Sequence, residues 1–538
     1  LGGLASPLGA VVGRLIIGLV TGWMSGRLFA PSAFINRDVL TDPETIRWQV
    51  RLVRRIVGEL RDHPAVAAWD LGNECNCMGR ADAHQAHLWT QAISGAIRST
   101  DPSRVVVSGM HSLAVDSSAA WSIRDQGELT DVLTTHPYPL FTPLVDLDPV
   151  TTLRPTAHAS CETRLYADLA GKPCFAEETG SLGPMTASDV LTPHYLRTAL
   201  WSLWANDGRG LLWWCAFDQA HLVHAPYDWN VAERELGLIR SNRSTKPILG
   251  EFSAFRAAQR TAGVDTLPPR LIDAVCVLTN NQESWPVAFN TWCNAKQAGL
   301  DIVFHSCDQP LPDAELYLVP CLTGGQPIKR HRWHALLERI AAGAVLYVSL
   351  NDWWGSEIEA VFGVENDERD KPGPRTWQLD GVAGNLPTSP VRWRLRPTRA
   401  QVLGREGDGN PVFTSATYGK GRIFLCTTPL ELDLARTPGV YAAGAVAWQV
   451  YAKIASSVPC RRSAVKTLPS TALTEHPVDD RRRLLVVINH HTDAVEERLN
   501  LISGWRMERI LHGQGRSDGA SLVLNLPRNS AALISLSR

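Results

Sequence analysis

Up to about residue 260, short apolar runs alternate with longer amphipathic stretches. Six of these runs have the length and composition of buried β-strands. A helix is predicted over residues 45–61, because Ile46, Val50, Val53 and Val57 recur at spacings of three and four. Strands joined by crossover helices pair in parallel, so the pattern predicts a doubly wound sheet or a (β/α)8 barrel. The six runs are residues 14–20, 65–71, 104–110, 131–136, 172–178 and 210–214.

A second α/β pattern follows between about residues 262 and 457. Four apolar runs, LIDAVCVLT, GLDIVFH, AELYLVPCL and AAGAVLYVSL, are typical of buried parallel strands, and an amphipathic helix is predicted at 329–342. The stretch YGKGRIFLCTTPLE predicts a hairpin and a late strand. These elements favour a flavodoxin-like (glutamine-amidotransferase-like) α/β domain. The Pro- and Arg-rich residues 369–399 are expected to form a long loop or flap within it.

The helical pattern disappears after residue 458. Short alternating strands replace it, which predicts a small C-terminal β-sandwich. We therefore expect three domains, residues 1–260, 261–457 and 458–538.

Composition narrows the class of protein. Lys plus Arg number 53 and Asp plus Glu 54, a net charge of -1, so no global field attracts nucleic acid or an acidic membrane. No segment has the length of uncharged apolar residues that a membrane span needs. The eleven cysteines lie mostly within apolar runs, which favours a reducing, cytoplasmic location.

Tryptophan is unusually frequent. The 19 Trp residues outnumber both the 12 Phe and the 9 Tyr. A Trp ring combines a flat apolar face with one donor, which suits stacking on sugar rings, but plain core packing is an equal alternative.

Two strands are predicted to end in glutamates. The string HPAVAAWDLGNECN, residues 63–76, ends an apolar run in Asn73 and Glu74, and GKPCFAEETG, residues 171–180, carries Glu177 and Glu178. In a (β/α)8 barrel the carboxyl ends of the strands open onto the active site, so these side chains would meet there. Such a pair suits glycoside hydrolysis, with one acid/base and one nucleophile.

These strings resemble clan A glycoside hydrolases, and most of all glycoside hydrolase family 5, in which Asn-Glu ends the fourth strand and Lys-Pro-x4-Glu-x-Gly ends the seventh. The resemblance implies that Glu74 is the acid/base, that Asn73 binds the sugar 2-OH and that Glu178 is the nucleophile. Glu177 is the alternative nucleophile. Glu178 is favoured because it stands two residues before Gly180, as in the family pattern.

Two further strings match the same family. THPYP supplies His136 and Tyr138, and the resemblance implies that the Tyr hydroxyl orients the nucleophile. GLLWWCAFD supplies Trp214, which by the same resemblance forms the floor of the subsite for the cleaved sugar.

The resemblance carries expectations about activity and assembly. It implies a retaining hydrolase of β-linked glycosides or oligosaccharides, with β-mannosides favoured over β-glucosides or β-galactosides, that works without cofactor or metal through a glycosyl-enzyme. Glu74 should then be protonated near neutral pH and Glu178 ionised. The order of the three domains resembles that of family 42 β-galactosidases, which implies a homo-oligomer, either a dimer or a trimer.

Two departures from the family pattern keep alternatives open. Only thirteen residues precede Arg14, so the TIM barrel is expected to be N-terminally incomplete, with about six strands and without the family Arg that contacts the nucleophile. The chain is then alternatively a non-catalytic or degenerate carbohydrate-binding protein. Zinc is a further alternative, since the donors Cys75, Cys77, His84 and His87 follow Glu74, although their spacing is unusual for zinc.

Overall fold

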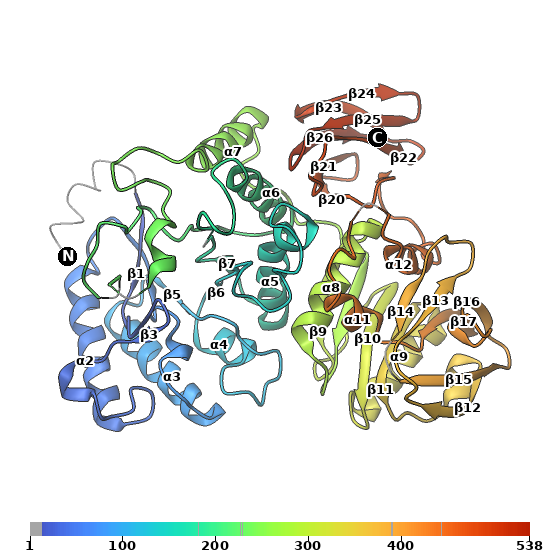
Figure 1. Ribbon diagram of the computed structural model, residues 1–538, viewed down its shortest axis with the longest axis horizontal. Coiled ribbons are helices and arrows are strands. Elements are labelled where there is room, and N and C mark those ends of the chain that lie inside the picture. Colours follow the sequence, from blue (N-terminus) through green and yellow to red (C-terminus); the bar gives the residue numbers. More distant parts are fainter. Residues whose placement is uncertain (1–12, 181, 226, 229, 389–390, 443) are drawn as a thin grey trace. The chain divides into compact units, whose positions relative to one another are not determined.

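The computed structural model describes residues 13–180, 182–225, 227–228, 230–388, 391–442 and 444–538 (Figure 1). The chain forms two compact units. The first comprises residues 1–138, 162–188 and 208–246, and the second residues 139–161, 189–207 and 247–538. Residues 1–12, with which the predicted first domain begins, lie outside the described residues. The predicted division at residues 260 and 457 stays a prediction.

The six apolar runs of the first unit lie side by side in chain order. β4 pairs in parallel with β1 and β5, β6 pairs in parallel with β7, and single parallel bridges, Val107 to Val132 and Ala176 to Leu211, join the remaining neighbours. The predicted parallel α/β arrangement is therefore confirmed. The strands are β1 (Leu15–Gly18), β4 (Val66–Asp70), β5 (Val105–Val107), β6 (Leu133–Thr135) and β7 (Cys174–Ala176), with a small hairpin of β2 (Trp23–Met24) and β3 (Arg27–Leu28).

Helices separate these strands, as the periodicity predicts. Helix α2 begins at Pro43 because the Asp42 carboxylate accepts from the N–H groups of Glu44 and Thr45, and it buries Val53 and Val57. A reciprocal pair of hydrogen bonds between Asp82 and Gln85 starts α3. The helices are α2 (Pro43–Leu60), α3 (Ala83–Thr100), α4 (Ile123–Leu129) and α5 (Leu153–Ala170), with single turns at Ser32–Phe34, Cys75–Cys77 and Val231–Glu235.

The second unit contains a nine-stranded sheet. Its parallel part has the order β9-β8-β10-β11-β18, which is the 2-1-3-4-5 order of flavodoxin-like folds, as predicted. These strands are β8 (Ala274–Leu278), β9 (Ile302–Ser306), β10 (Leu316–Gly324), β11 (Val345–Trp353) and β18 (Gly421–Cys426). Antiparallel strands β17 (Pro411–Tyr418), β16 (Gln401–Glu406), β13 (Arg375–Leu379) and β14 (Leu386–Thr388) extend the sheet.

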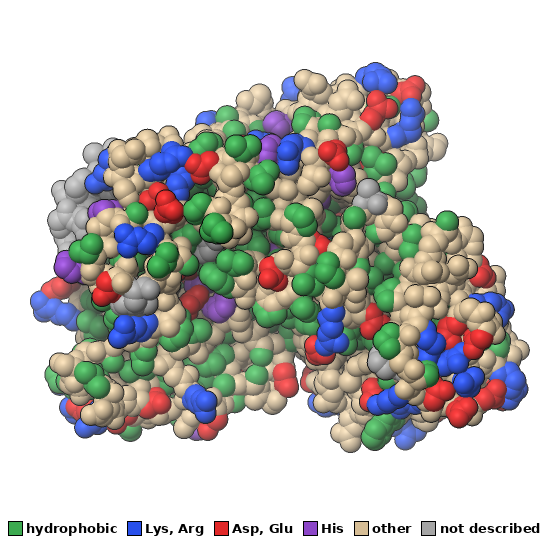
Figure 2. Space-filling view, viewed as in Figure 1, with side chains coloured by type: hydrophobic (Ala, Val, Ile, Leu, Met, Phe, Trp, Pro, Cys, Tyr) green, Lys and Arg blue, Asp and Glu red, His purple; other side chains and the backbone are tan. Residues whose placement is uncertain are grey.

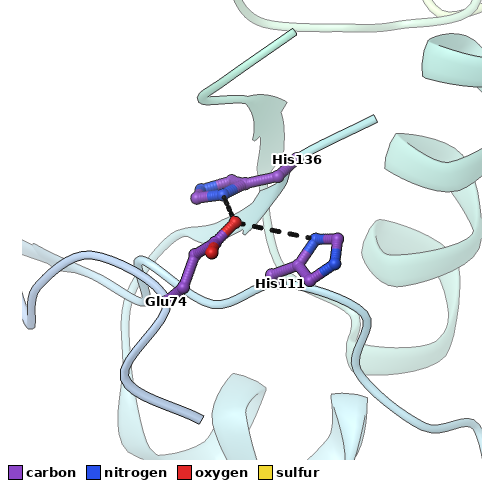
Figure 3. Close-up of side chains that lie close together, drawn as sticks. All are labelled: Glu74, His111 and His136. Atoms are coloured by element: carbon purple, nitrogen blue, oxygen red, sulfur yellow. Dashed lines mark hydrogen bonds and ion pairs between the residues drawn. The ribbon is translucent and has the colours of Figure 1, made fainter. Parts of the chain in front are cut away.

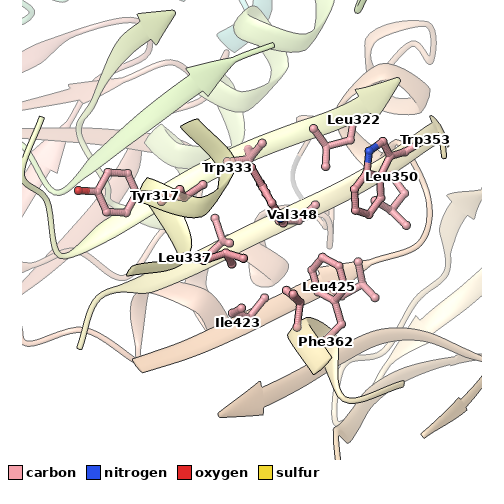
Figure 4. Packing of buried hydrophobic residues seen from close by; sticks show 14 of the residues in the cluster. Tyr317, Leu322, Trp333, Leu337, Val348, Leu350, Trp353, Phe362, Ile423 and Leu425 are labelled. Atoms are coloured by element: carbon pink, nitrogen blue, oxygen red, sulfur yellow. The ribbon is translucent and has the colours of Figure 1, made fainter. Parts of the chain in front are cut away.

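One face of this sheet is covered by α9 (Arg330–Ala342), the helix that the sequence predicts at 329–342. Trp333 and Leu337 of α9 pack with Val348 of β11 and Leu425 of β18 in a buried apolar cluster (Figure 4). The unit's remaining helices are α6 (Thr192–Ala205), α7 (Leu249–Ala262), α8 (Ser284–Ala298), α10 (Ile358–Phe362), α11 (Leu430–Ala435) and α12 (Trp448–Ala455).

The expectation of a loop at residues 369–399 is wrong. Strand β12 (Val364–Asp370) pairs antiparallel with β15 (Arg392–Pro397), and β13 and β14 lie between them in sequence. The outward positions of β12 and β15 carry charged side chains, so these strands lack the continuous apolar pattern of a buried strand. Instead, opposite charges face each other across the pair, such as Glu368 and Arg394 at 3.4 Å, and both signs are mixed over these strands (Figure 2).

Two four-stranded antiparallel sheets form the C-terminal part, as predicted. Their orders are β19-β22-β25-β24 and β20-β21-β26-β23, and one buried apolar cluster, which includes Leu499 and Ile534, draws residues from both. The strands are β19 (Ala464–Val465), β20 (Thr471–Pro477), β21 (Arg482–Asn489), β22 (Val495–Leu501), β23 (Arg506–His512), β24 (Gln514–Asp518), β25 (Ser521–Leu526) and β26 (Ala531–Ser537). No helix among the described residues is long and apolar enough to cross a membrane.

Candidate active site

The predicted site residues of the first unit come from the carboxyl ends of its parallel strands. Glu74 lies four residues after β4, His136 directly after β6, and Glu178 two residues after β7. The chain turns sharply at Gly72, where a Cβ atom would clash with the Val20 carbonyl oxygen, and Glu74 itself has a φ of 45°. The Glu74 N–H donates to the Gly109 carbonyl oxygen at 2.9 Å, which fixes this turn beside the loop after β5.

One buried imidazole joins the two glutamates. His136, with a side chain only 1% exposed, has its Nδ1 atom 2.9 Å from Glu74 Oε1 and 3.5 Å from Glu178 Oε2. Both carboxylates remain partly open to solvent, with exposures of 16% and 17%. The strand ends therefore bring the two predicted catalytic carboxylates together.

Tyr138 distinguishes the two neighbouring glutamates. Its hydroxyl donates to Glu178 Oε2 at 2.6 Å. Glu177 points to the other side of His136, where its Oε2 lies 3.7 Å from Nε2. Glu178 thus contacts both a hydroxyl donor and the nitrogen shared with Glu74. This geometry favours Glu178 over Glu177 as the nucleophile, but the roles stay predictions.

The two other predicted substrate-binding residues are held by neighbours in the same unit. Asn73 Nδ2 donates to the Trp23 carbonyl oxygen at 2.9 Å. Trp214 Nε1 donates to Glu233 Oε2 at 2.9 Å, and the Trp214–Cys215 peptide bond is cis. These two hydrogen bonds fix the orientations of both side chains, while binding of sugar by either one stays a prediction.

The pKa shifts of Glu74 and Glu178 are opposite to the expectation that Glu74 is protonated and Glu178 ionised. Burial alone raises the pKa of Glu74, but the hydrogen bond and the charge of His136 outweigh burial and leave the pKa below its ordinary value. Burial also raises the pKa of Glu178. The charge of His136 and the hydrogen bond from Tyr138 both lower this pKa, but not enough to offset burial, so it stays above its ordinary value. In the free site, Glu74 is therefore the more acidic carboxyl, although it was expected to keep the proton.

His136 explains this reversal. Burial lowers the pKa of its imidazole, but the charge of Glu178 and the hydrogen bonds to Glu177 and Glu74 hold that pKa well above its usual range. The proton expected on Glu74 is thus held on His136 Nδ1, within hydrogen-bond distance of Glu74 Oε1. Local sequence could not show this, because the carboxylates around the imidazole come from two distant segments, Glu74 from one and the neighbours Glu177 and Glu178 from the other.

Three side chains at the site offer atoms that could ligate a metal. The ligating atoms of Glu74, His111 and His136 lie within 4.8 Å of one another, each from a different loop (Figure 3). Since a carboxylate oxygen only accepts, His136 Nδ1 must donate to Glu74 Oε1, and it then has no lone pair for a metal. The donor set therefore suits proton transfer better than metal binding. Among the described residues, the proposed zinc ligands Cys75, Cys77, His84 and His87 form no such cluster.

Sequence reasoning missed three polar residues of this site. His111 Nδ1 lies 3.9 Å from Glu74 Oε1, and Glu233 accepts from Trp214. Asp70, at the end of β4, accepts from the Gly72 N–H at 3.1 Å, and burial raises its pKa well above the ordinary value. His111 follows the third apolar run and could have been found by its place after a strand. Glu233 stands in the short helical turn Val231–Glu235, 19 residues after Trp214 and away from any predicted strand, and gives no such signal.

Paired carboxylates at the carboxyl ends of parallel strands are typical of (β/α)8 glycoside hydrolases. Comparisons with known proteins agree, although no protein-family model matches the chain. The chain is 28% identical over 129 residues to a probable mannan endo-1,4-β-mannosidase A-2 from Aspergillus terreus, covering 22% of this chain and 32% of that protein. It is 36% identical over 78 residues to mannan endo-1,4-β-mannosidase F from Aspergillus clavatus, covering 14% and 18%. The chain thus spans a third or less of the length of these two relatives.

Solved structures extend the likeness over the whole chain. An exo-β-1,4-mannosidase from Opitutaceae bacterium strain TAV5 matches with a TM-score of 0.68 and 21% identity over 86% of each chain. A catalytic mutant of a GH42 β-galactosidase from G. stearothermophilus matches with a TM-score of 0.72 and 12% identity over 100% of this chain and 90% of the other. The named relatives and structural neighbours are glycosidases, and the resemblance to clan A, with a multidomain layout like families 5 and 42, is confirmed.

Proposed function

We propose that the chain is a retaining β-glycosidase that acts on β-mannosides before β-glucosides or β-galactosides. The observation that carries the proposal is the contact of Glu74 and Glu178 with one nitrogen of His136. The preference for β-mannosides is supported by the names of the relatives, which include mannan endo-1,4-β-mannosidases and an exo-β-1,4-mannosidase.

The separation of the carboxylates is compatible with retention. Glu74 Oε1 and Glu178 Oε2 lie 2.9 Å and 3.5 Å from the same nitrogen, so these two oxygens are no further apart than the sum of the two distances. Within this limit the carboxyl groups can stand at the ~5–5.5 Å that retaining enzymes need. Glu178 is then close enough to attack the anomeric carbon of a sugar that Glu74 protonates.

The first step uses the proton that His136 holds. The negative charge of Glu178 is the strongest influence that keeps His136 protonated against burial. Glu178 loses this charge when its Oε2 atom bonds to the anomeric carbon. His136 then becomes more acidic and passes its Nδ1 proton to Glu74, while Glu74 gives a proton to the departing glycosidic oxygen. The products are a glycosyl ester on Glu178, a neutral His136 and the free alcohol.

The second step reverses this transfer. Glu74 takes a proton from water, the resulting hydroxide attacks the anomeric carbon, and the ester bond to Glu178 breaks. As Glu178 regains its charge, it again favours the protonated form of His136. The hydrogen bond from Tyr138 stabilises the carboxylate that leaves.

Trp214 and Glu233 provide a further contact for the sugar. The hydrogen bond between Trp214 Nε1 and Glu233 Oε2 fixes the indole, whose flat face suits the apolar face of a pyranose. Glu233 still has a second carboxylate oxygen with which it can accept from a sugar hydroxyl.

Hydrolysis of a panel of p-nitrophenyl β-D-glycosides tests the proposal. We expect release of p-nitrophenol from the β-mannoside at the highest kcat/KM, and ¹H NMR should show the β-anomer of mannose as the first product. Release of the α-anomer would contradict retention. Binding of mannosides without turnover would instead favour a carbohydrate-binding protein.

A further inference from the structure

The carboxyl edge of the flavodoxin-like sheet in the second unit carries a second cavity. Its volume is about 650 Å³, within the ~300–1,000 Å³ of small-molecule sites. Loops after β8, β10 and β11 line it. Strand order reverses between β8 and β10, and open α/β sheets bind ligands at such a point, outside the carboxyl ends of their strands.

Three tryptophans shape this cavity. Trp333 and Trp353 line it and are 8% and 7% exposed, and both also belong to the buried apolar cluster of α9 and the sheet (Figure 4). Trp354 is different, since 70% of it is exposed. An exposed Trp on a rigid strand end is costly to leave in water, and it offers a flat apolar face to a ligand.

The backbone holds Trp354 in place. Its N–H donates to the Gly324 carbonyl oxygen at 3.1 Å, so the end of β11 stays attached to the end of β10. A Cβ atom at Gly325 would lie 3.6 Å from the Trp354 ring, which therefore stands directly over this glycine. The Asn280 N–H donates to the Pro327 carbonyl oxygen at 2.8 Å and fixes the loop after β8 in the same way. The indole is thus presented by a preformed rim.

The polar groups of the rim favour a neutral ligand. Lys329 is paired with Asp308 at 3.0 Å, which compensates its charge. Glu357 lies on the same rim as Lys329, Arg330 and His334, so charges of both signs face the cavity. A polyanion would meet Glu357, whereas the hydroxyl groups of a saccharide can accept from and donate to such a mixed set.

We infer that this cavity is a second saccharide-binding site, with Trp354 as its stacking platform. The inference stands on the second unit alone. Only the choice of a β-mannan oligosaccharide as the first probe depends on the proposed function.

Isothermal titration calorimetry on the full chain tests this site. The probes are β-1,4-mannotetraose, cellotetraose and inorganic phosphate, and all variants carry Glu178→Gln so that no probe is consumed. We expect Trp354→Ala to remove one class of tetrasaccharide sites or to raise its Kd at least about tenfold. Trp48→Ala, which truncates a 46% exposed Trp of α2, is the matched control and should change nothing.

The outcomes separate this site from the proposed active site. Tetrasaccharide binding that Trp214→Ala abolishes and Trp354→Ala leaves intact would overturn the inference, as would the absence of any saccharide binding. Binding of phosphate alone, weakened by Trp354→Ala, would also overturn it and indicate an anion site. If the wild-type chain hydrolyses no glycoside, and Trp354→Ala still removes saccharide binding, the proposed function fails and this inference stands.

Discussion

Two buried histidines in the two units have opposite protonation. His136 is 1% exposed and His490 is 3% exposed, so burial disfavours the cation at both. Carboxylates surround His136 and hold its pKa well above the usual range. His490 has Nδ1 2.7 Å from the Thr156 hydroxyl oxygen, and burial together with the charges of Lys296 and Lys466 lowers its pKa to about 3.

The difference shows which buried polar group can do chemistry. With a pKa of about 3, His490 is neutral near neutral pH, and the Thr156 hydroxyl satisfies its Nδ1 atom, which is the behaviour of a structural residue. His136 holds a proton next to two partly exposed carboxylates that can take it. At similar burial the neighbouring charges therefore decide which histidine holds a proton, and the proton on His136 is the one that the proposed mechanism uses.

The largest expected effect is that of replacing Glu178, whose Oε2 lies 3.5 Å from His136 Nδ1. Glu178→Gln should lower kcat on p-nitrophenyl β-mannoside by about 10⁴-fold or more, because it removes the proposed nucleophile. Glu177→Gln is the matched control, since its carboxylate lies on the other side of the same imidazole. An equal or greater loss in the Glu177 variant would exchange the two roles.

Asparagine substitutions test the two histidines directly, since the Asn side chain can place a polar atom near the Nδ1 position. His136→Asn should lower kcat by about 10²- to 10⁴-fold, the range of acid/base catalysis. The alkaline limb of kcat/KM should move to lower pH, because the proton would then be held by Glu74 alone. An unchanged alkaline limb would show that His136 stores no catalytic proton.

His490→Asn is the counterpart in the second unit. It should leave kcat unchanged and lower the free energy of unfolding by about 1–3 kcal/mol, because the shorter side chain leaves part of the space of the buried imidazole unfilled. Urea unfolding and steady-state kinetics on the same preparation measure both. A loss of activity without a loss of stability would contradict the structural role of His490.

Tyr138→Phe removes one hydrogen bond to Glu178. Because that bond lowers the pKa of Glu178 in the free site, the substitution should raise this pKa and move the acid limb of kcat/KM to higher pH. Loss of a hydrogen bond to a charged group is worth about 1.5–3 kcal/mol, so kcat should fall about 10- to 100-fold. A pH–rate profile that falls in height without moving its acid limb would argue against contact between Tyr138 and the ionised nucleophile.

The smallest expected effect is on the way in which the free energy of unfolding depends on pH. A histidine with a lowered folded pKa costs stability as pH falls below its unfolded value of ~6.5, by up to about 1.4 kcal/mol per pH unit. His490→Asn should therefore flatten the loss of stability between about pH 6.5 and 5. A histidine with a raised folded pKa loses its contribution as pH rises above ~6.5, so His136→Asn should flatten the alkaline side. Urea midpoints at several pH values measure both, and identical curves for the two variants would contradict the opposite shifts.

Much of the fold was visible in the sequence, because buried parallel strands are continuous apolar runs. Glu74, His136, Tyr138, Glu178 and Trp214 could be placed for the same reason, since each ends such a run or follows one within a few residues. Strands β12 and β15 escaped because their charged outward positions break the apolar pattern. Glu233 and the proton on His136 depend on contacts between distant segments, and no local spacing encodes them.

Trapping the glycosyl-enzyme tests the central claim most directly. The wild-type chain is incubated with 2,4-dinitrophenyl 2-deoxy-2-fluoro-β-D-mannoside, and its peptides are analysed by mass spectrometry. The account predicts one added fluoro-sugar, located on Glu178 and absent from Glu178→Gln. An adduct on Glu177 or Glu74, or turnover of β-mannosides with no adduct at all, would contradict it.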